Sequence, residues 1–199
     1  MLEKAVITTQ QGSYTRVQYA RFADDMVILI DSSPRHDWLV RAVEVRLREE
    51  LAKLKVEINE EKTRMVNLAK GESFGFLGFE FRQVRSRNGK LRPQYVPKMK
   101  KRTALLRKLK AIFQCYVSQP VKLVIAEINP ILRGWITYFR VGNSSRCFSF
   151  IKRWVEKKIR RHLMRARQRK GFGWKRWSTK WLYANLGLYQ NYSLRKVTG

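Results

Sequence analysis

The hydrophobic pattern of the first fifty residues combines two short apolar runs with one helical stripe. Residues 17–20 and the apolar run 26–30 flank Asp24 and Asp25, an order that predicts a strand, a tight turn and a second strand. Leucine or valine then recurs every four residues from 39 to 51. This period predicts an amphipathic helix that begins near Ser33-Pro34 and packs on the two strands.

The following segment is also strand-like. Residues 62–66 and the aromatic-rich run 74–81 favour strands, and Gly78 indicates a bend or the close approach of another backbone. The dipeptide Asn88-Gly89 is a strong signal for a two-residue hairpin. Pro97 should end this sheet region.

From residue 98 the apolar positions follow a helical period. One helix is expected after Lys98, a second begins near Pro120, Pro130 starts or kinks another, and a long helix opens at Asn143 or Ser144. The apolar positions on these helical faces are Leu105, Leu109, Ile112, Phe113, Tyr116, Ile131, Leu132, Trp135, Ile136, Phe139, Ile151, Val155, Ile159 and Leu163. Strands followed by helices predict an α+β fold.

The net charge of +28 is extreme and unevenly distributed. Residues 1–97 hold 17 Lys and Arg and 13 Asp and Glu, whereas residues 98–199 hold 26 basic and 2 acidic residues and five of the six tryptophans. Basic runs often form solvated helix faces, and membrane surfaces also attract them. No apolar run in the sequence approaches transmembrane length. A folded, basic and aromatic-rich module favours nucleic acid, where cations meet phosphates and rings stack on bases.

Asp24 and Asp25 are the main candidates for chemistry in the chain. Adjacent acids repel each other, and a divalent cation between them relieves the repulsion and supports phosphoryl transfer. A solvated turn is the alternative interpretation of this pair. The two cysteines lack metal-ligand spacing and the two histidines are isolated, so a reducing intracellular compartment is expected.

The order of these features resembles group II intron reverse transcriptase/maturases of bacteria. The segments that carry the resemblance are the catalytic block at 19–28, the next palm block at 54–63, the primer-grip block at 76–79, the maturase signature at 128–139 and the C-terminal extension at 174–188. The resemblance implies the C-terminal part of a right-hand polymerase palm at 1–97, a helical thumb at 98–127 and a maturase domain at 128–199. It also implies RNA-directed DNA synthesis coupled to intron splicing.

The family's catalytic residues map onto a few positions of this sequence. Asp24 and Asp25 would bind Mg²⁺, and Lys62 would act near the leaving pyrophosphate, with a solvated turn lysine as its alternative. Phe76, Leu77 and Gly78 would form the primer grip.

Two departures from the family pattern affect the expected activity. Phe22 stands where the family usually has tyrosine. The fingers and the first metal-binding Asp of the family should precede Asp24, and residues 1–15 are too few to hold them. We therefore expect an incomplete Mg²⁺ site and no polymerisation by this chain alone, with a separate N-terminal reverse transcriptase half as a possible partner.

The expected partners are group II intron RNA and an RNA template with its DNA primer, with no membrane, in the bacterial cytoplasm near the nucleoid. Trp174, Trp177 and Trp181 either stack on RNA or close a small core, and Gly134 is expected to let another backbone approach. A non-enzymatic splicing cofactor and a nonspecific basic nucleic-acid binder are the alternative functions. The candidate nucleic-acid-binding residues are Lys100, Lys101, Arg107, Arg133, Arg140, Arg153, Lys157, Arg160, Arg161 and Trp174.

Overall fold

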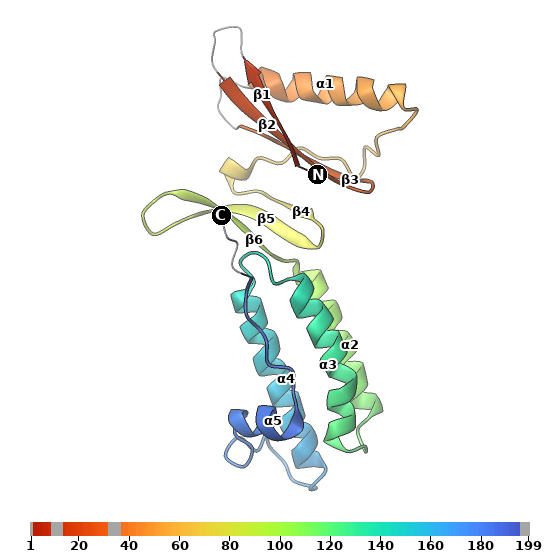
Figure 1. The fold of residues 1–199 in the computed structure, drawn as a ribbon, viewed down its shortest axis with the longest axis vertical. Coiled ribbons are helices and arrows are strands. Elements are labelled where there is room, and N and C mark those ends of the chain that lie inside the picture. The colour runs from red at the N-terminus through yellow and green to blue at the C-terminus, as the bar shows by residue number, and fades with distance from the viewer. Residues whose placement is uncertain (1, 9–13, 32–36, 196–199) are drawn as a thin grey trace. The chain divides into compact units, whose positions relative to one another are not determined.

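A computed structural model describes residues 2–8, 14–31 and 37–195 of the chain, and Figure 1 shows its strands and helices. Contacts divide the chain into a first unit, residues 1–76 and 82–92, and a second unit, residues 77–81 and 93–199. The mixture of two small antiparallel sheets and five helices confirms the predicted α+β class.

The first sheet contains β1 (Leu2–Thr8), β2 (Tyr14–Phe22) and β3 (Asp25–Ile30), in the spatial order β1-β2-β3. Both pairs are antiparallel, and Phe22 faces Asp25 at the closed end of the β2–β3 hairpin. The predicted strand, turn and strand are therefore confirmed. The strand β1 was not predicted, although its run of β-branched residues near Val6 and Ile7 is typical of a strand.

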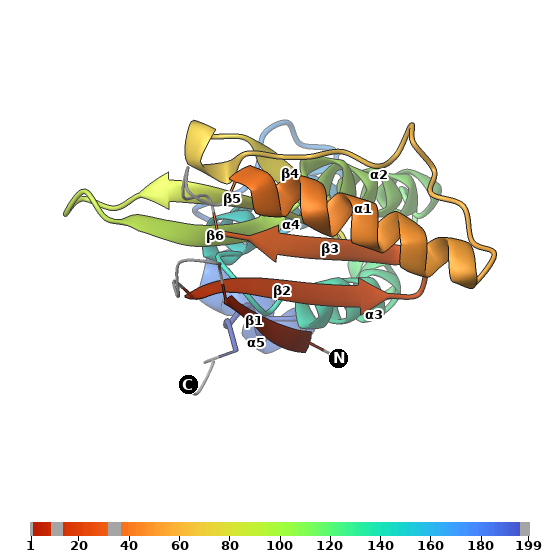
Figure 2. The same ribbon diagram turned by 90° about the horizontal axis from the view of Figure 1, so that it is seen from above.

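Helix α1 (Asp37–Lys53) lies on one side of this sheet, as Figures 1 and 2 show. Leu39 is buried at 2% exposure, whereas Val43, Leu47 and Leu51 are only half-buried. The predicted apolar stripe is thus present on the helix. Its predicted start at Ser33-Pro34 lies outside the described residues.

The predicted strand at residues 62–66 is wrong. The backbone N–H groups of Lys62 and Thr63 both donate to the carbonyl oxygen of Asn59, at 3.1 and 3.0 Å, and the Asn59 side chain also accepts from Lys62. These local bonds hold the chain in a turn and occupy donors that a strand would need. A short 3₁₀ helix, η2 (Leu68–Lys70), follows.

The second sheet contains β4 (Ser73–Phe76), β5 (Phe79–Arg85) and β6 (Leu91–Pro97), in the order β4-β5-β6. A turn at Leu77-Gly78 divides the predicted strand 74–81 in two, with φ values of +47° and +79°. The bend expected at Gly78 is confirmed. Pro97 ends β6, as predicted.

The β5–β6 hairpin has a longer loop than predicted. The N–H of Gly89 donates to the Ser86 carbonyl at 2.9 Å, and the N–H of Ser86 donates to the Lys90 carbonyl at 2.8 Å, so three residues form the loop. Only Gly89 has a positive φ, of +74°, whereas a two-residue type I′ turn needs positive φ at two successive positions. The hairpin is confirmed and its two-residue loop is wrong.

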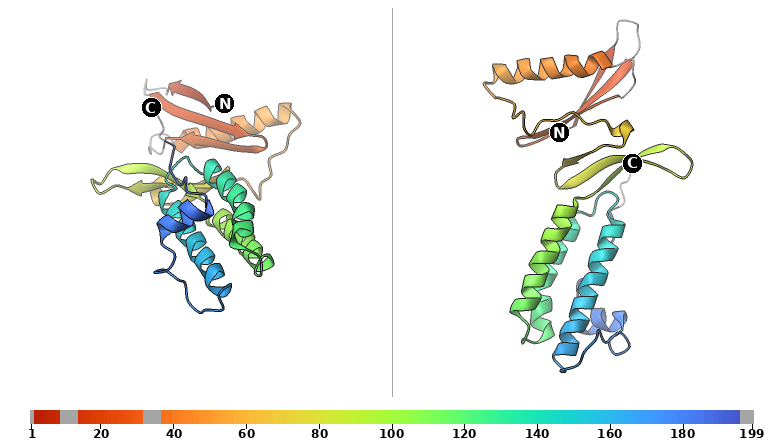
Figure 3. Two further views of the ribbon diagram at one scale, coloured as in Figure 1. Left: turned by 60° about the horizontal axis from the view of Figure 1, so that its bottom comes forward. Right: turned by 180° about the vertical axis from the view of Figure 1, so that it is seen from behind.

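The second unit is built mainly from α2 (Met99–Cys115), α3 (Val121–Tyr138), α4 (Ser145–Arg165) and α5 (Thr179–Leu186), shown in Figure 3. Pro130 lies inside α3, and the helix continues on both sides of it because Ile128 and Leu132 pack in the same core. Pro130 therefore starts no separate helix. None of the helices formed by the described residues is long and apolar enough to cross a membrane.

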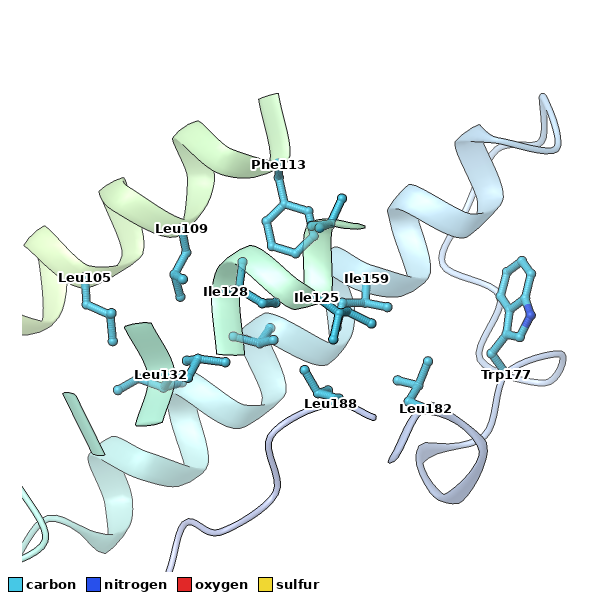
Figure 4. Packing of buried hydrophobic residues seen from close by; sticks show 13 residues of the cluster. Leu105, Leu109, Phe113, Ile125, Ile128, Leu132, Ile159, Trp177, Leu182 and Leu188 are labelled. Atoms are coloured by element: carbon cyan, nitrogen blue, oxygen red, sulfur yellow. The ribbon is translucent and has the colours of Figure 1, made fainter. Parts of the chain in front are cut away.

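The core of the second unit lies between α2, α3 and α4, and α5 closes one end of it (Figure 4). The predicted apolar faces meet there and confirm the helical period. The buried residues of this core are Leu105, Leu109, Phe113, Val124, Ile125, Ile128, Leu132, Ile151, Val155, Ile159, Trp177, Leu182 and Leu188. A smaller cluster joins Phe79 of β5 to Ile136, Phe139 and Phe148.

The loop between α3 and α4 is attached to the end of β6 within the second unit. The Tyr95 carbonyl accepts from the N–H of Asn143 at 2.9 Å, and the N–H of Tyr95 donates to Asn143 Oδ1 at 3.2 Å. Gly142 has φ +81°, and a Cβ atom there would collide with the Tyr95 ring and lie 2.8 Å from its carbonyl oxygen. This attachment requires glycine at position 142.

Substitution of Gly142→Ala should lower the free energy of unfolding by about 2–4 kcal/mol, because strain at positive φ adds to the overlap with Tyr95. Gly134→Ala is the matched control. A Cβ at Gly134 would meet nothing within 4 Å, so the alanine should stabilise α3 by up to about 1 kcal/mol. Urea unfolding followed by tryptophan fluorescence measures both changes, and equal effects would contradict the assignment.

Candidate nucleic-acid interface

Asp24 and Asp25 lie at the closed end of the β2–β3 hairpin and are exposed. Ala23 has φ +51°, and Arg21 Nε donates to its carbonyl oxygen at 2.9 Å, which holds the turn. The neighbouring Phe22 ring is 64% exposed. The structure thus presents two adjacent carboxylates on a tight turn, as the sequence predicted.

The donor set around these carboxylates fits only part of a Mg²⁺ site. Mg²⁺ requires near-octahedral oxygen coordination. Among residues 2–8, 14–31 and 37–195, no group of three or more His, Cys, Asp or Glu residues is placed to hold a metal ion. Asp24 and Asp25 would therefore supply two ligands, and the remaining ones would have to come from water or phosphate oxygens. Their metal-binding role stays a prediction.

Lys62 lies in the turn that Asn59 holds after α1, and its side chain is exposed. No contact joins Lys62 to Asp24 or Asp25 among the described interactions. Its predicted action on a leaving pyrophosphate stays a prediction.

The segment predicted as a primer grip forms the turn between β4 and β5. The Leu77 carbonyl accepts from Tyr138 Oη at 2.9 Å, and the Gly78 carbonyl accepts from the N–H of Lys98 at 2.9 Å. Helices α2 and α3 therefore fix the position of the Leu77-Gly78 backbone, while Phe76 precedes the turn as the last residue of β4. A fixed backbone suits a positioning role, which stays a prediction.

Most of the candidate RNA-binding cations lie on the surface of α2, α3 and α4. The exposed ones are Lys100, Lys101, Arg107, Arg133, Arg153, Lys157 and Arg161. Gly134, beside Arg133, is also exposed and no other part of the described chain approaches it, so the expected close packing at Gly134 is wrong. Trp135 packs against Phe139 instead, with ring centroids 4.3 Å apart.

Arg160 does not lie on the exposed face of α4, so its predicted position at the surface is wrong. Its side chain is 1% exposed, with Nη1 lying 3.6 Å from Glu156 Oε2. Its Nε donates to the Trp177 carbonyl at 2.9 Å, and Nη2 donates to Thr179 Oγ1 at 3.0 Å. Arg160 therefore attaches the segment before α5 to α4 from inside the unit.

Arg140 is half-buried rather than freely exposed. Its Nη2 donates to the Asn191 carbonyl at 3.4 Å, and its own carbonyl accepts from the N–H of Arg195 at 3.0 Å. These contacts attach the C-terminal stretch to the end of α3. Arg140 is thus a structural residue in this unit, although part of it still reaches the surface.

The three tryptophans near the C-terminus have different positions. Trp177 is buried in the core at 5% exposure. Trp181 is half-buried and packs against this core, whereas Trp174 is 53% exposed. Arg160 Cζ lies 4.2 Å from the centroid of the Trp174 ring. Of the three, only Trp174 has a largely free ring, which favours its prediction as a stacking residue.

Sequence reasoning named Arg161 but missed the cations that lie beside it in the structure. Arg161, Arg165, Arg169 and Lys170 line one open pocket with Gln168 and Gly171. The signal in the sequence was the dense basic run 165–170 followed by glycine. Periodicity could not place Arg169 and Lys170 because they lie beyond the end of α4.

Two family models match separate parts of the chain. The family model for reverse transcriptase (RNA-dependent DNA polymerase) matches residues 2–81, which include both strands of the carboxylate hairpin. The model for the group II intron, maturase-specific domain matches residues 102–181 on the basic helices. The chain thus joins a reverse transcriptase segment to a maturase domain, and it belongs to the group II intron reverse transcriptase/maturases. A search of curated proteins gave no match.

These matches confirm the resemblance identified in the sequence. The maturase model extends from α2 to α5, across the boundary predicted at residues 127 and 128, and α3 is continuous there. The domain boundaries at 97 and 127 stay predictions.

Proposed function

We propose that the chain binds folded group II intron RNA through its basic helices and assists splicing of that RNA. The observation that carries this proposal is the uncompensated charge of residues 98–199, which contain 26 basic residues and only Glu127 and Glu156 as acids. Glu156 is buried and paired with Arg160, so Glu127 is the only acid of this segment at the surface. A surface of this kind favours binding to a polyanion.

The rigidity of the helical unit supports recognition of a shaped RNA. Exposed cations project from α2, α3 and α4, whose opposite faces are locked in one core. Charges held at fixed positions match one arrangement of phosphates better than others, which is how proteins recognise structured RNA. A disordered basic tail would not provide such selectivity.

For the reverse transcriptase segment we propose contacts with an RNA template and a DNA primer, in the bacterial cytoplasm near the nucleoid. Asp24 and Asp25 on their exposed turn would face the primer end. Contact of the Leu77-Gly78 backbone with the primer is a separate part of this proposal. Polymerisation would need a carboxylate ligand in addition to Asp24 and Asp25, because two ligands hold Mg²⁺ poorly.

The test is a competition assay with the full chain and a labelled, folded group II intron RNA. Unlabelled folded intron RNA should displace the label at a lower concentration than duplex RNA of equal length at moderate salt, where the nonspecific term is weakened. If both RNAs compete equally, the chain is a nonspecific basic nucleic-acid binder and the proposal fails. The rate at which a precursor RNA is spliced, with and without the chain, then measures the effect on splicing directly. Gel electrophoresis separates the spliced products from the precursor.

A further inference from the structure

The pocket beyond α4 is formed by the way the helix ends. The N–H of Arg169 turns back to the Met164 carbonyl at 3.0 Å, and the N–H of Gln168 donates to the Arg165 carbonyl at 2.8 Å. Positive φ values of +55° at Gln168 and +99° at Gly171 complete the reversal. The result is an open pocket of about 370 Å³, lined by Arg161, Arg165, Gln168, Arg169, Lys170 and Gly171.

The pocket gathers positive charge without an acidic partner from the described part of the chain. Its four cations take part in none of the ion pairs observed there. Burial, together with Arg161, Lys110, Arg165 and Lys157, lowers the pKa of the neighbouring Lys158. The α4 C-terminus relieves only part of this repulsion, because a helix end carries about half an elementary charge. An external anion would neutralise the rest.

Aromatic rings extend from this pocket to the surface. The Phe172 centroid lies 5.7 Å from Cζ of the pocket residue Arg161 and 4.6 Å from Nζ of Lys157. The ring centroids of Phe172 and Trp174 are 6.3 Å apart, and Trp174 is 53% exposed. Arg160, itself fixed by Trp177 and Thr179, lies over the Trp174 ring and holds it in place. The Trp174 ring is thus partly open and held in position before any ligand arrives.

We propose that this pocket and Trp174 form a subsite for an unpaired nucleotide of a folded RNA. Backbone phosphates enter the pocket, and the base that they carry stacks on Trp174. The inference rests on the proposed RNA binding and adds which part of the RNA this surface binds, namely an unpaired nucleotide. A small polyphosphate would use only the four cations, whereas a bulged or looped nucleotide uses both the cations and the ring.

Two RNA hairpins of equal length serve as probes, one with a single bulged 2-aminopurine and one fully paired. The full chain should bind the bulged hairpin about tenfold more tightly, as expected for one stacked base, and should quench its fluorescence. Trp174→Leu should abolish the preference and the quenching, while Trp174→Phe keeps most of both. Thermal melting establishes that each variant is folded.

The phosphate part of the subsite is tested with the double variant Arg165→Gln and Arg169→Gln. Both hairpins should bind it more weakly, and the slope of log affinity against log salt should flatten by roughly 0.7 for each phosphate that is no longer neutralised. The control is Arg87→Gln with Lys90→Gln, which removes the same charge from the exposed β5–β6 hairpin. The control should leave the slope unchanged.

The outcomes separate this inference from the proposed function. If the chain binds intron RNA selectively but the pocket variant matches its control, or Trp174→Leu keeps the preference for the bulge, the subsite is overturned and the proposed function stands. If tripolyphosphate displaces both hairpins at an equal phosphate concentration, the pocket is a small-anion site and the inference is overturned. If the wild-type chain binds no RNA, both proposals fail.

Discussion

Replacing Glu156 by glutamine should lower the free energy of unfolding by about 3–5 kcal/mol, because it leaves a buried guanidinium without its anion. Glu156 is 6% exposed and Arg160 is 1% exposed. Glu156 Oε2 lies 3.6 Å from Arg160 Nη1, and Oε1 accepts from Tyr183 Oη at 2.8 Å. Within the described structure, Nη1 has no hydrogen-bond partner, so the attraction of Glu156 is its main compensation.

The effect of this substitution should spread to the C-terminal segment. Arg160 also binds the Trp177 carbonyl and Thr179 Oγ1, which join α4 to the start of α5. Burial and the neighbouring Glu156 raise the pKa of Tyr183, so its hydroxyl remains a donor at every ordinary pH. An uncompensated Arg160 would move towards water and release these contacts together.

Urea unfolding followed by tryptophan fluorescence reports this change, since five of the six tryptophans lie in residues 98–199. The matched control is Glu127→Gln, which makes the same chemical change at the exposed acid of α3. It should alter stability by less than about 0.5 kcal/mol. If Glu156→Gln and Glu127→Gln lower the free energy of unfolding by similar amounts, the buried pair of Glu156 and Arg160 does not stabilise the fold as argued.

The parts of the fold that were predicted correctly are those in which one period persists. The four-residue steps through Ile151, Val155 and Ile159 identified α4 because all three residues are buried in the core. Residues 62–66 form no strand because Asn59 accepts the hydrogen bonds of the Lys62 and Thr63 N–H groups in a local turn. Turn geometry at Gly89 depended on one φ value, which composition alone does not determine.

The sequence predicts the parts of the candidate site that are formed by neighbouring residues. It does not predict the parts that depend on contacts between residues distant in the sequence. Asp24 and Asp25 are neighbours between two apolar runs, so their exposed turn followed from the sequence. Arg160 was assigned to the surface because it stands among the many basic residues between the apolar positions of α4. Its burial depends on Trp177 and Thr179, which fold back from beyond the helix.

Reversing two exposed charges of α4, with Lys157→Glu and Arg161→Glu, should weaken RNA binding on the order of 100-fold at low salt. Each lysine or arginine that neutralises a phosphate releases counterions on binding, and each glutamate adds repulsion. The slope of log affinity against log salt should therefore flatten by roughly 1.4 for two contacts to single-stranded segments. Arg160 is left unchanged, because reversing a buried charge would unfold the unit and lower affinity for another reason.

Filter binding of the folded intron RNA across a salt series measures both quantities on the full chain. The control, Arg87→Glu with Lys90→Glu, reverses two exposed charges in the β5–β6 hairpin and changes the net charge equally. If binding depends only on total charge, the two double variants will lose the same affinity and the same slope. A loss confined to the α4 variant locates phosphate contacts on the maturase helices, because only there does the position of the charge matter.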